Sequence, residues 1–183
     1  MRFLFALLAV AMVPAQETQD PVFGTTVYAA GGFEGLVYKL EPETQWLPDF
    51  KKLTAVGKLY TDAINVPPQT FETGFPGISE KFELFAIAYS AFFYVREPVT
   101  YQFGLISDDG SKLFIDGKLL IDNDGLHVPR FIGGRRKLTA GTHSIRVEYF
   151  QGRRPGLALQ LGIGLPGKEL QVFRCRNFQP PRE

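Results

Sequence analysis

Two neighbouring carboxylates, Asp108 and Asp109, are the residues of this sequence best suited to chemistry. They follow one apolar stretch and precede another, within the run Ser107-Asp108-Asp109-Gly110-Ser111. Carboxylate oxygens are the ligands that hard cations such as calcium prefer. On a trans peptide in an extended strand the two side chains would point to opposite faces, so a shared ion requires a cis or strongly bent linkage. Two neutralising partners stay open: calcium, or the guanidinium groups of Arg153 and Arg154.

A second acidic run, Asp122-Asn123-Asp124-Gly125, has a superficial likeness to an EF-hand loop. Aligning Gly125 with the invariant loop glycine puts Leu120 at the first ligand position and Phe131 at the last, so the EF-hand is rejected. Asp and Asn side chains cap tight turns, and glycine tolerates left-handed backbone. We therefore predict structural turn roles for Asp122, Asp124 and Gly125, and likewise for Gly110, Asp116 and Gly117.

The basic residues form local clusters at Arg130, at Arg135-Arg136-Lys137 and at Arg153-Arg154. The chain as a whole has 20 basic and 19 acidic side chains, so it has no global field to attract nucleic acid or an anionic membrane. The structural interpretation of the clusters is a solvated surface. The functional interpretation is recognition of an acidic glycan, because arginine pairs bidentately with carboxylates and sulfates.

The common enzyme signatures are missing from the sequence. It has no GxSxG, P-loop or HExxH motif, and His127 and His143 are not spaced as a metal pair. Cys175 is the single cysteine, which excludes an internal disulfide and a CxxC site, and we expect a buried or inert thiol there. These observations predict a protein that is not an enzyme.

The elements around the aspartate pair have the pattern of short strands. Residues 84–95 and 100–106 are rich in aromatic and β-branched side chains, and Asp116-Gly117 between two apolar runs is typical of a two-residue hairpin. Residues 144–150 alternate, and period two places Phe103, Ile145, Val147 and Tyr149 on core faces. The prolines predict a largely irregular stretch from Glu41 to Ile78, with a single helical turn near residues 47–53. The fold class is therefore all-β, a sandwich or barrel.

Several of these segments together resemble the PA14 domain family. They are YQFGLISDDGSKLFIDG from Tyr101, LLIDNDGLH from Leu119, LTAGTHSIRVEYF from Leu138 and GLALQL from Gly156, preceded by GFPGI and FELFAIAYSAFFYV. The likeness extends over residues 35–166. It implies a β-sandwich with jelly-roll-like antiparallel topology, usually a carbohydrate-binding module, without catalytic residues of its own.

The resemblance also implies a site. In the fungal adhesins of that family a cis Asp-Asp pair binds calcium, which in turn binds sugar hydroxyls, and Asp108 and Asp109 match that pair. Those adhesins complete the calcium site with an Asn from a second loop. The corresponding loop here, residues 151–156, offers only Gln151, beside Arg153 and Arg154. The candidate metal ligands are thus Asp108 and Asp109, and the candidate ligand-binding set adds Gln151, Arg153 and Arg154.

The N-terminal residues resemble an export signal. Arg2 precedes the apolar run of residues 3–13, and Ala15 suits signal peptidase. We predict a signal peptide over 1–15, a weakly structured segment over 16–33, the PA14-like domain over 34–166, and a C-terminal strand or tail packing on the domain over 167–183. No cysteine suits a lipoprotein anchor, and no later stretch has the length of a membrane span. This predicts a protein secreted or held in the periplasm or cell envelope, without stable membrane insertion.

Two functions from different classes are open at this point. The first is a secreted lectin-like module that binds a glycan or polysaccharide at the Asp108-Asp109 end of the sandwich. The second is a non-catalytic structural or adaptor domain that binds another envelope or extracellular protein and uses the aspartates only as a turn. Nucleic acid is not an expected partner of either.

Overall fold

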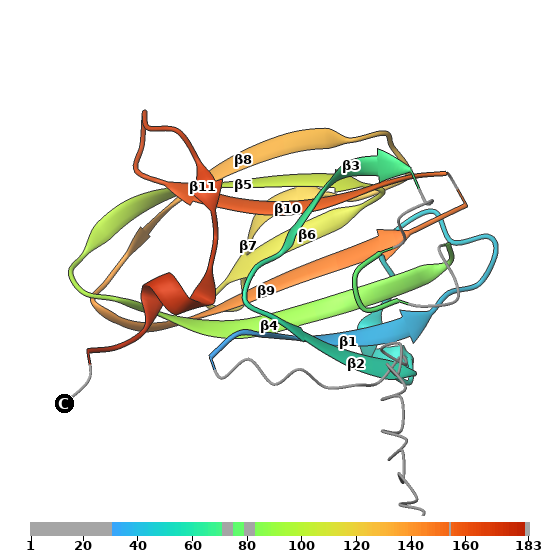
Figure 1. The fold of residues 1–183 in the computed structure, drawn as a ribbon, viewed down its shortest axis with the longest axis horizontal. Coiled ribbons are helices and arrows are strands. Elements are labelled where there is room, and N and C mark those ends of the chain that lie inside the picture. Colours follow the sequence, from blue (N-terminus) through green and yellow to red (C-terminus); the bar gives the residue numbers. More distant parts are fainter. Residues whose placement is uncertain (1–30, 71–74, 79–82, 154, 182–183) are drawn as a thin grey trace, which may run out of the picture.

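The computed structural model describes residues 31–70, 75–78, 83–153 and 155–181; the expected signal peptide lies outside them. Two antiparallel sheets face each other (Figure 1). The first has the order β2 (Gly57–Thr61), β1 (Phe33–Lys39), β4 (Phe85–Val95), β9 (Gly141–Gln151), β6 (Ser111–Ile115), β7 (Lys118–Asn123). The second has the order β11 (Gln171–Val172), β10 (Gly156–Gly164), β5 (Val99–Asp108), β8 (Arg130–Leu138), with β3 (Asn65–Thr70) also paired to β10. The predicted fold class, an all-β antiparallel sandwich, is confirmed.

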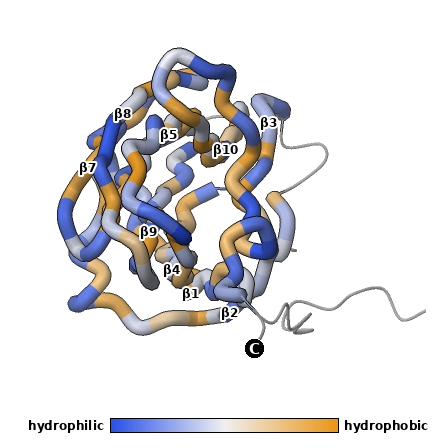
Figure 2. Tube along the Cα trace, turned by 90° about the vertical axis from the view of Figure 1, so that its left-hand side faces the viewer, coloured by the Kyte–Doolittle hydropathy of each residue, from blue (hydrophilic) through white to orange (hydrophobic). Residues whose placement is uncertain are grey.

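The core lies between the sheets because alternate residues of each strand face inward. Phe103, Ile145, Val147 and Tyr149 are each at most 1% exposed and belong to one hydrophobic cluster, so the predicted faces are correct. Figure 2 shows this alternation as changes between hydrophobic and hydrophilic colour along the strands. The hairpin is also where the sequence predicts it, with Asp116 and Gly117 at φ 51° and 70° between β6 and β7.

The prediction of a largely irregular stretch from Glu41 to Ile78 is wrong in part. β2 and β3 both lie within it, although β3 contains Pro67 and Pro68. Proline cannot donate to a sheet ladder and is tolerated on an edge strand, and β3 pairs with β10 alone. The single turn of helix is present as the 3₁₀ helix η1 (Phe50–Lys52), where the Asp49 side chain accepts from Lys51 N.

The C-terminal segment closes one end of the sandwich. After β11, Phe173 and Cys175 are fully buried, and the 3₁₀ helix η3 (Cys175–Phe178) stacks Phe178 on Phe173 at 5.1 Å between ring centroids. Within the described residues no helix is both long and apolar enough to cross a membrane.

Antiparallel pairing brings distant connections together at the other end, which we call the loop end. Asp108 pairs with Ala158, and Ser111 pairs with both Tyr149 and Asn123. The β5–β6 turn, the β7–β8 connection and the β9–β10 connection therefore meet there. The β4–β5 turn and the β6–β7 hairpin turn lie at the opposite end, which is also the end where η3 packs on β4 (Figure 1).

Candidate binding site at the loop end

The two aspartates converge on one connection. Their peptide bond is cis, and their residues are 3% and 0% exposed. A methyl group built on Gly156 would lie 2.7 Å from Asp108 Oδ2, and one built on Gly152 would lie 3.1 Å from Asp109 Oδ2. Both carboxylates thus face the β9–β10 connection, which approaches them closely because it has glycine at these two positions.

Asp109 is hydrogen-bonded to two other connections of the loop end. Its Oδ1 accepts from the backbone N–H of His127 at 3.1 Å, and its Oδ2 accepts from Gly152 N at 2.9 Å and from the Gln151 amide at 3.4 Å. Donors from the β7–β8 and β9–β10 connections therefore stabilise a carboxylate of the β5–β6 turn. Hydrogen bonds of this kind favour the charged form of a buried acid.

Tyr149 supports the pair from the core side. Its hydroxyl donates to the Asp108 carbonyl oxygen at 2.7 Å and also contacts Gln151 Oε1. Burial, together with the charges of Asp109 and Asp108, holds the pKa of Tyr149 well above its ordinary value of 10.0. The phenol therefore stays a neutral donor, which suits a position beside two carboxylates.

The predicted ligand residues of the β9–β10 connection do not all face outward. Gln151 is fully buried, and besides Asp109 it donates to the Gly156 carbonyl oxygen at 3.0 Å. It positions the connection instead of presenting itself to a ligand. Arg153 is exposed, and no ion pair within the described part of the chain joins it to Asp108 or Asp109, contrary to direct pairing with that arginine. Arg154 lies outside the described residues.

Four of the predicted turn residues lie at the same end: Gly110, Asp122, Asp124 and Gly125. Asp122 Oδ1 accepts from Asp124 N, and Asp124 Oδ1 accepts from both Gly125 N and Leu47 N at 2.8 Å. The other Asp124 oxygen accepts from Lys112 Nζ at 2.9 Å. Asp124 thus fastens the β1–β2 connection to the loop end, a contact between residues 77 positions apart.

Gly110 and Gly125 make this closeness sterically possible. A methyl group on Gly110 would come within 2.4 Å of the Phe150 ring and 2.8 Å of Gly125 N. Gly125 has φ 100° and lies under the ring of Trp46, which would be 3.0 Å from a methyl group there. Both positions require glycine, for space at Gly110 and for space and backbone conformation at Gly125.

The surface around the buried carboxylates has an apolar rim. Trp46 and Val128 are 64% and 66% exposed, and Leu126 is 38% exposed. Leu126 would lie 2.8 Å from a methyl group on Gly152, whose other near neighbour is Asp109. Leu126 therefore lies next to Asp109, and Trp46 and Val128 belong to neighbouring connections of the loop end; we call these three residues the rim.

The residues present fit a hard cation only in part. Two acidic side chains face one connection, and the glycines leave room for backbone oxygens to approach. Among the described residues no group of three or more His, Cys, Asp or Glu side chains could hold a metal, so neutral oxygens would have to complete the shell. Gln151 presents its amide nitrogen to Asp109 and would have to turn over to serve as a ligand.

Sequence reasoning missed His127, Gly152, Gly156 and Tyr149. His127 contributes through its backbone N–H, which leaves no trace in side-chain type. The two glycines could have been identified from the sequence, because they lie in a short connection that also contains proline. Tyr149 was expected in the core, and its hydroxyl reaches the site because β9 ends there.

A family model for the PA14 domain matches residues 48–173. The chain belongs to the PA14 domain family. The match begins and ends later than the 35–166 likeness, and includes β11 and Phe173.

Solved structures share the fold. An anti-sigma factor domain-containing protein has 22% identity and TM-score 0.63; the match covers 82% of this chain and 48% of that one, so this chain spans about half of that protein. The PA14 domain of the MpAFP antifreeze protein has 17% identity and TM-score 0.67, over 80% and 88% of the two chains. A PA14 sugar-binding domain from an RTX adhesin has 18% identity and TM-score 0.66, over 81% and 97%. Comparison with curated proteins gave no match.

Proposed function

We propose that this PA14 protein is a non-catalytic carbohydrate-binding module whose loop end binds a glycan. One observation carries the proposal: two buried carboxylates converge on a glycine-containing connection, at an end where three connections are held together by hydrogen bonds. Such a preorganised group of polar atoms is typical of a ligand site on a rigid scaffold. The similarity to a PA14 domain described as sugar-binding supports the same class of ligand.

Calcium is the cofactor that we propose for this site. Asp108 and Asp109 would hold the ion, and backbone oxygens of the β9–β10 connection would complete its shell. When bound, the ion supplies open coordination positions that sugar hydroxyls can fill. The backbone N–H groups of His127 and Gly152, together with the Gln151 amide, hold the Asp109 carboxylate in place.

Calcium titration by calorimetry, followed by a glycan array with and without EDTA, tests this proposal. We expect binding of calcium, a higher melting temperature with the ion, and glycan binding that EDTA abolishes. Asp108→Asn should remove all three. Glu97→Gln, an exposed acid of the β4–β5 turn at the opposite end, is the matched control and should remove none.

Two other outcomes would contradict different parts of the proposal. Glycan binding that EDTA leaves unchanged would contradict the role of calcium and keep the lectin function. Loss of an acidic glycan when Arg153 is replaced by Ala would then identify Arg153 as a residue that binds the glycan. Absence of any glycan binding would remove the lectin function itself.

The adaptor function is the second candidate, because the exposed rim of Trp46, Leu126 and Val128 is apolar. A protein partner would bury this rim, so Trp46→Ser should abolish its binding while calcium binding stays unchanged. A sugar ligand would still require the aspartates.

We also propose that the protein is exported, and that residues 1–15 are removed. Mass spectrometry of protein from a native extract should find an N-terminus near Gln16. Retention of Met1 in a cytosolic fraction would contradict export.

A further inference from the structure

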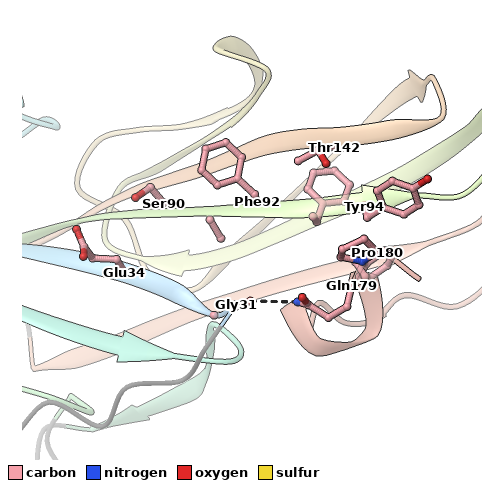
Figure 3. A pocket seen from close by; sticks show the side chains of 12 residues that line it. Gly31, Glu34, Ser90, Phe92, Tyr94, Thr142, Gln179 and Pro180 are labelled. Atoms are coloured by element: carbon pink, nitrogen blue, oxygen red, sulfur yellow. Dashed lines mark hydrogen bonds between the residues drawn. The ribbon is translucent and has the colours of Figure 1, made fainter. Parts of the chain in front are cut away.

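A groove lies on the first sheet beside the second half of β4, away from the aspartates. It has a volume of about 490 Å³ and extends over β4 between β1 and the segment after η3 (Figure 3). This size is within the range of small-molecule sites. Phe92 and Tyr94 belong to its lining, and they lie near the end of β4 that pairs with the start of β9. The groove is therefore separate from the loop end, where β9 finishes.

Phe92 is the most exposed ring of this groove. It is 70% exposed, more than Trp46 or Val128, and at its position β4 pairs with β9 alone, because the pairing with β1 ends at Ser90. Its ring stands on the outer face of the sheet, with Tyr94 two residues further on the same face (Figure 3). An exposed aromatic ring stabilises a complex when a ligand covers it and excludes water. The Phe92 ring is therefore placed to stack against a flat apolar surface of a ligand.

The wall of the groove is fixed before any ligand arrives. Gln179 Nε2 donates to the Gly31 carbonyl oxygen at 3.3 Å and to the Cys175 carbonyl oxygen at 2.9 Å. The Phe178 ring contacts the buried Phe93 ring edge-on, with 5.9 Å between the ring centroids, and this contact holds the segment against the core. A preformed groove loses little entropy on binding.

The polar lining contains a single charge. Glu34 is the only charged side chain among the described residues that line the groove, and it accepts from Lys58 Nζ and the Tyr60 hydroxyl at 3.0 Å each. Its charge is therefore already compensated by Lys58. Ser90 precedes Phe92 on the same strand, and Thr142 pairs with Tyr94 from β9, so both add hydroxyl groups near the rings (Figure 3). An exposed ring near hydroxyls and a carboxylate matches a ligand that has apolar C–H faces and many hydroxyls.

We propose that this groove is a second glycan-binding site, which takes a neutral saccharide and needs no metal ion. The sugar ring stacks on Phe92, and its hydroxyls bond to Glu34, Ser90 and Thr142. An acidic sugar is disfavoured, because no lining side chain is basic and the one charge is negative. The inference goes beyond the proposed function: it concerns another face and stands if the loop end binds nothing.

Affinity electrophoresis in excess EDTA, through gels that contain xylan, mannan or a soluble β-glucan, tests the second site. We expect at least one of these neutral polymers to retard the parent protein. Phe92→Thr should weaken that retardation about tenfold, the loss of one well-placed aromatic contact. Threonine is a β-branched residue that favours strands, so the fold should persist.

The matched control is Phe131→Thr, an aromatic that is 53% exposed on β8 of the other sheet. It should leave retardation unchanged, and the excess EDTA separates this site from a calcium-dependent loop end. Three results overturn the proposal: no retardation of the parent by any polymer, equal losses for Phe92→Thr and Phe131→Thr, or a change of oligomeric state by Phe92→Thr in sedimentation. The last would make the groove a contact between copies of this chain.

Discussion

Replacing Gly156 by Ala tests the geometry of the loop end directly. The new methyl group would lie 2.7 Å from Asp108 Oδ2, closer than real side chains approach. Asp108 is only 3% exposed, so its carboxylate has little room to move away. Overpacking of this kind costs about 1–3 kcal/mol. The substitution also stiffens the unfolded chain, which offsets about 0.4–1 kcal/mol.

We therefore expect Gly156→Ala to lower the free energy of unfolding by about 1–2 kcal/mol. For a chain of this size that is a fall in melting temperature of about 2–8 °C. Thermal melts and urea unfolding measure both quantities, and glycan or calcium titration should weaken in parallel because Asp108 is displaced. Gly133→Ala is the matched control: its methyl group would have its nearest neighbours at 3.6 Å, so it should stabilise slightly.

A Gly156→Ala protein as stable as the parent would refute this reasoning. It would mean that Asp108 does not face the β9–β10 connection, and the convergence of the two carboxylates would fail with it. If Gly133→Ala instead destabilised the protein as much as Gly156→Ala does, the loss of stability would be an effect of glycine replacement in general.

Three further predictions concern the rest of the fold. Val147 is fully buried, so Val147→Ala should cost about 1–3 kcal/mol in chemical denaturation, and an unchanged midpoint would contradict its place in the core. Burial lowers the pKa of His143, but hydrogen bonds to the Thr139 carbonyl oxygen and to Asp116 raise it above 6.5. Thermal stability should therefore be highest below that pH and decline as pH rises through the folded-state pKa, and Asp116→Asn should make the decline smaller. Burial raises the pKa of Cys175 to about 12, so an alkylating reagent should label it only after unfolding, and rapid labelling of the folded protein would disprove this.

Local pattern was enough to predict the strands that form the core. Period-two alternation over residues 144–150 and the Asp116-Gly117 turn both depend on neighbours in the sequence, and both match the structure. β3 was missed for the opposite reason: its prolines argue against a strand, and only pairing with one side of β10 makes them tolerable.

The sequence by itself determined the fold class, the core faces and the aspartate pair as the place to look. Only the tertiary structure decided what surrounds that pair. The donors to Asp109 are backbone groups of His127 and Gly152, and their approach depends on where β7 and β9 end relative to β5. The distance between such groups is set by sheet register across many residues, and a backbone N–H is the same in every residue but proline. Side-chain types therefore indicate which acids matter, while the packing of two sheets decides which groups donate hydrogen bonds to them.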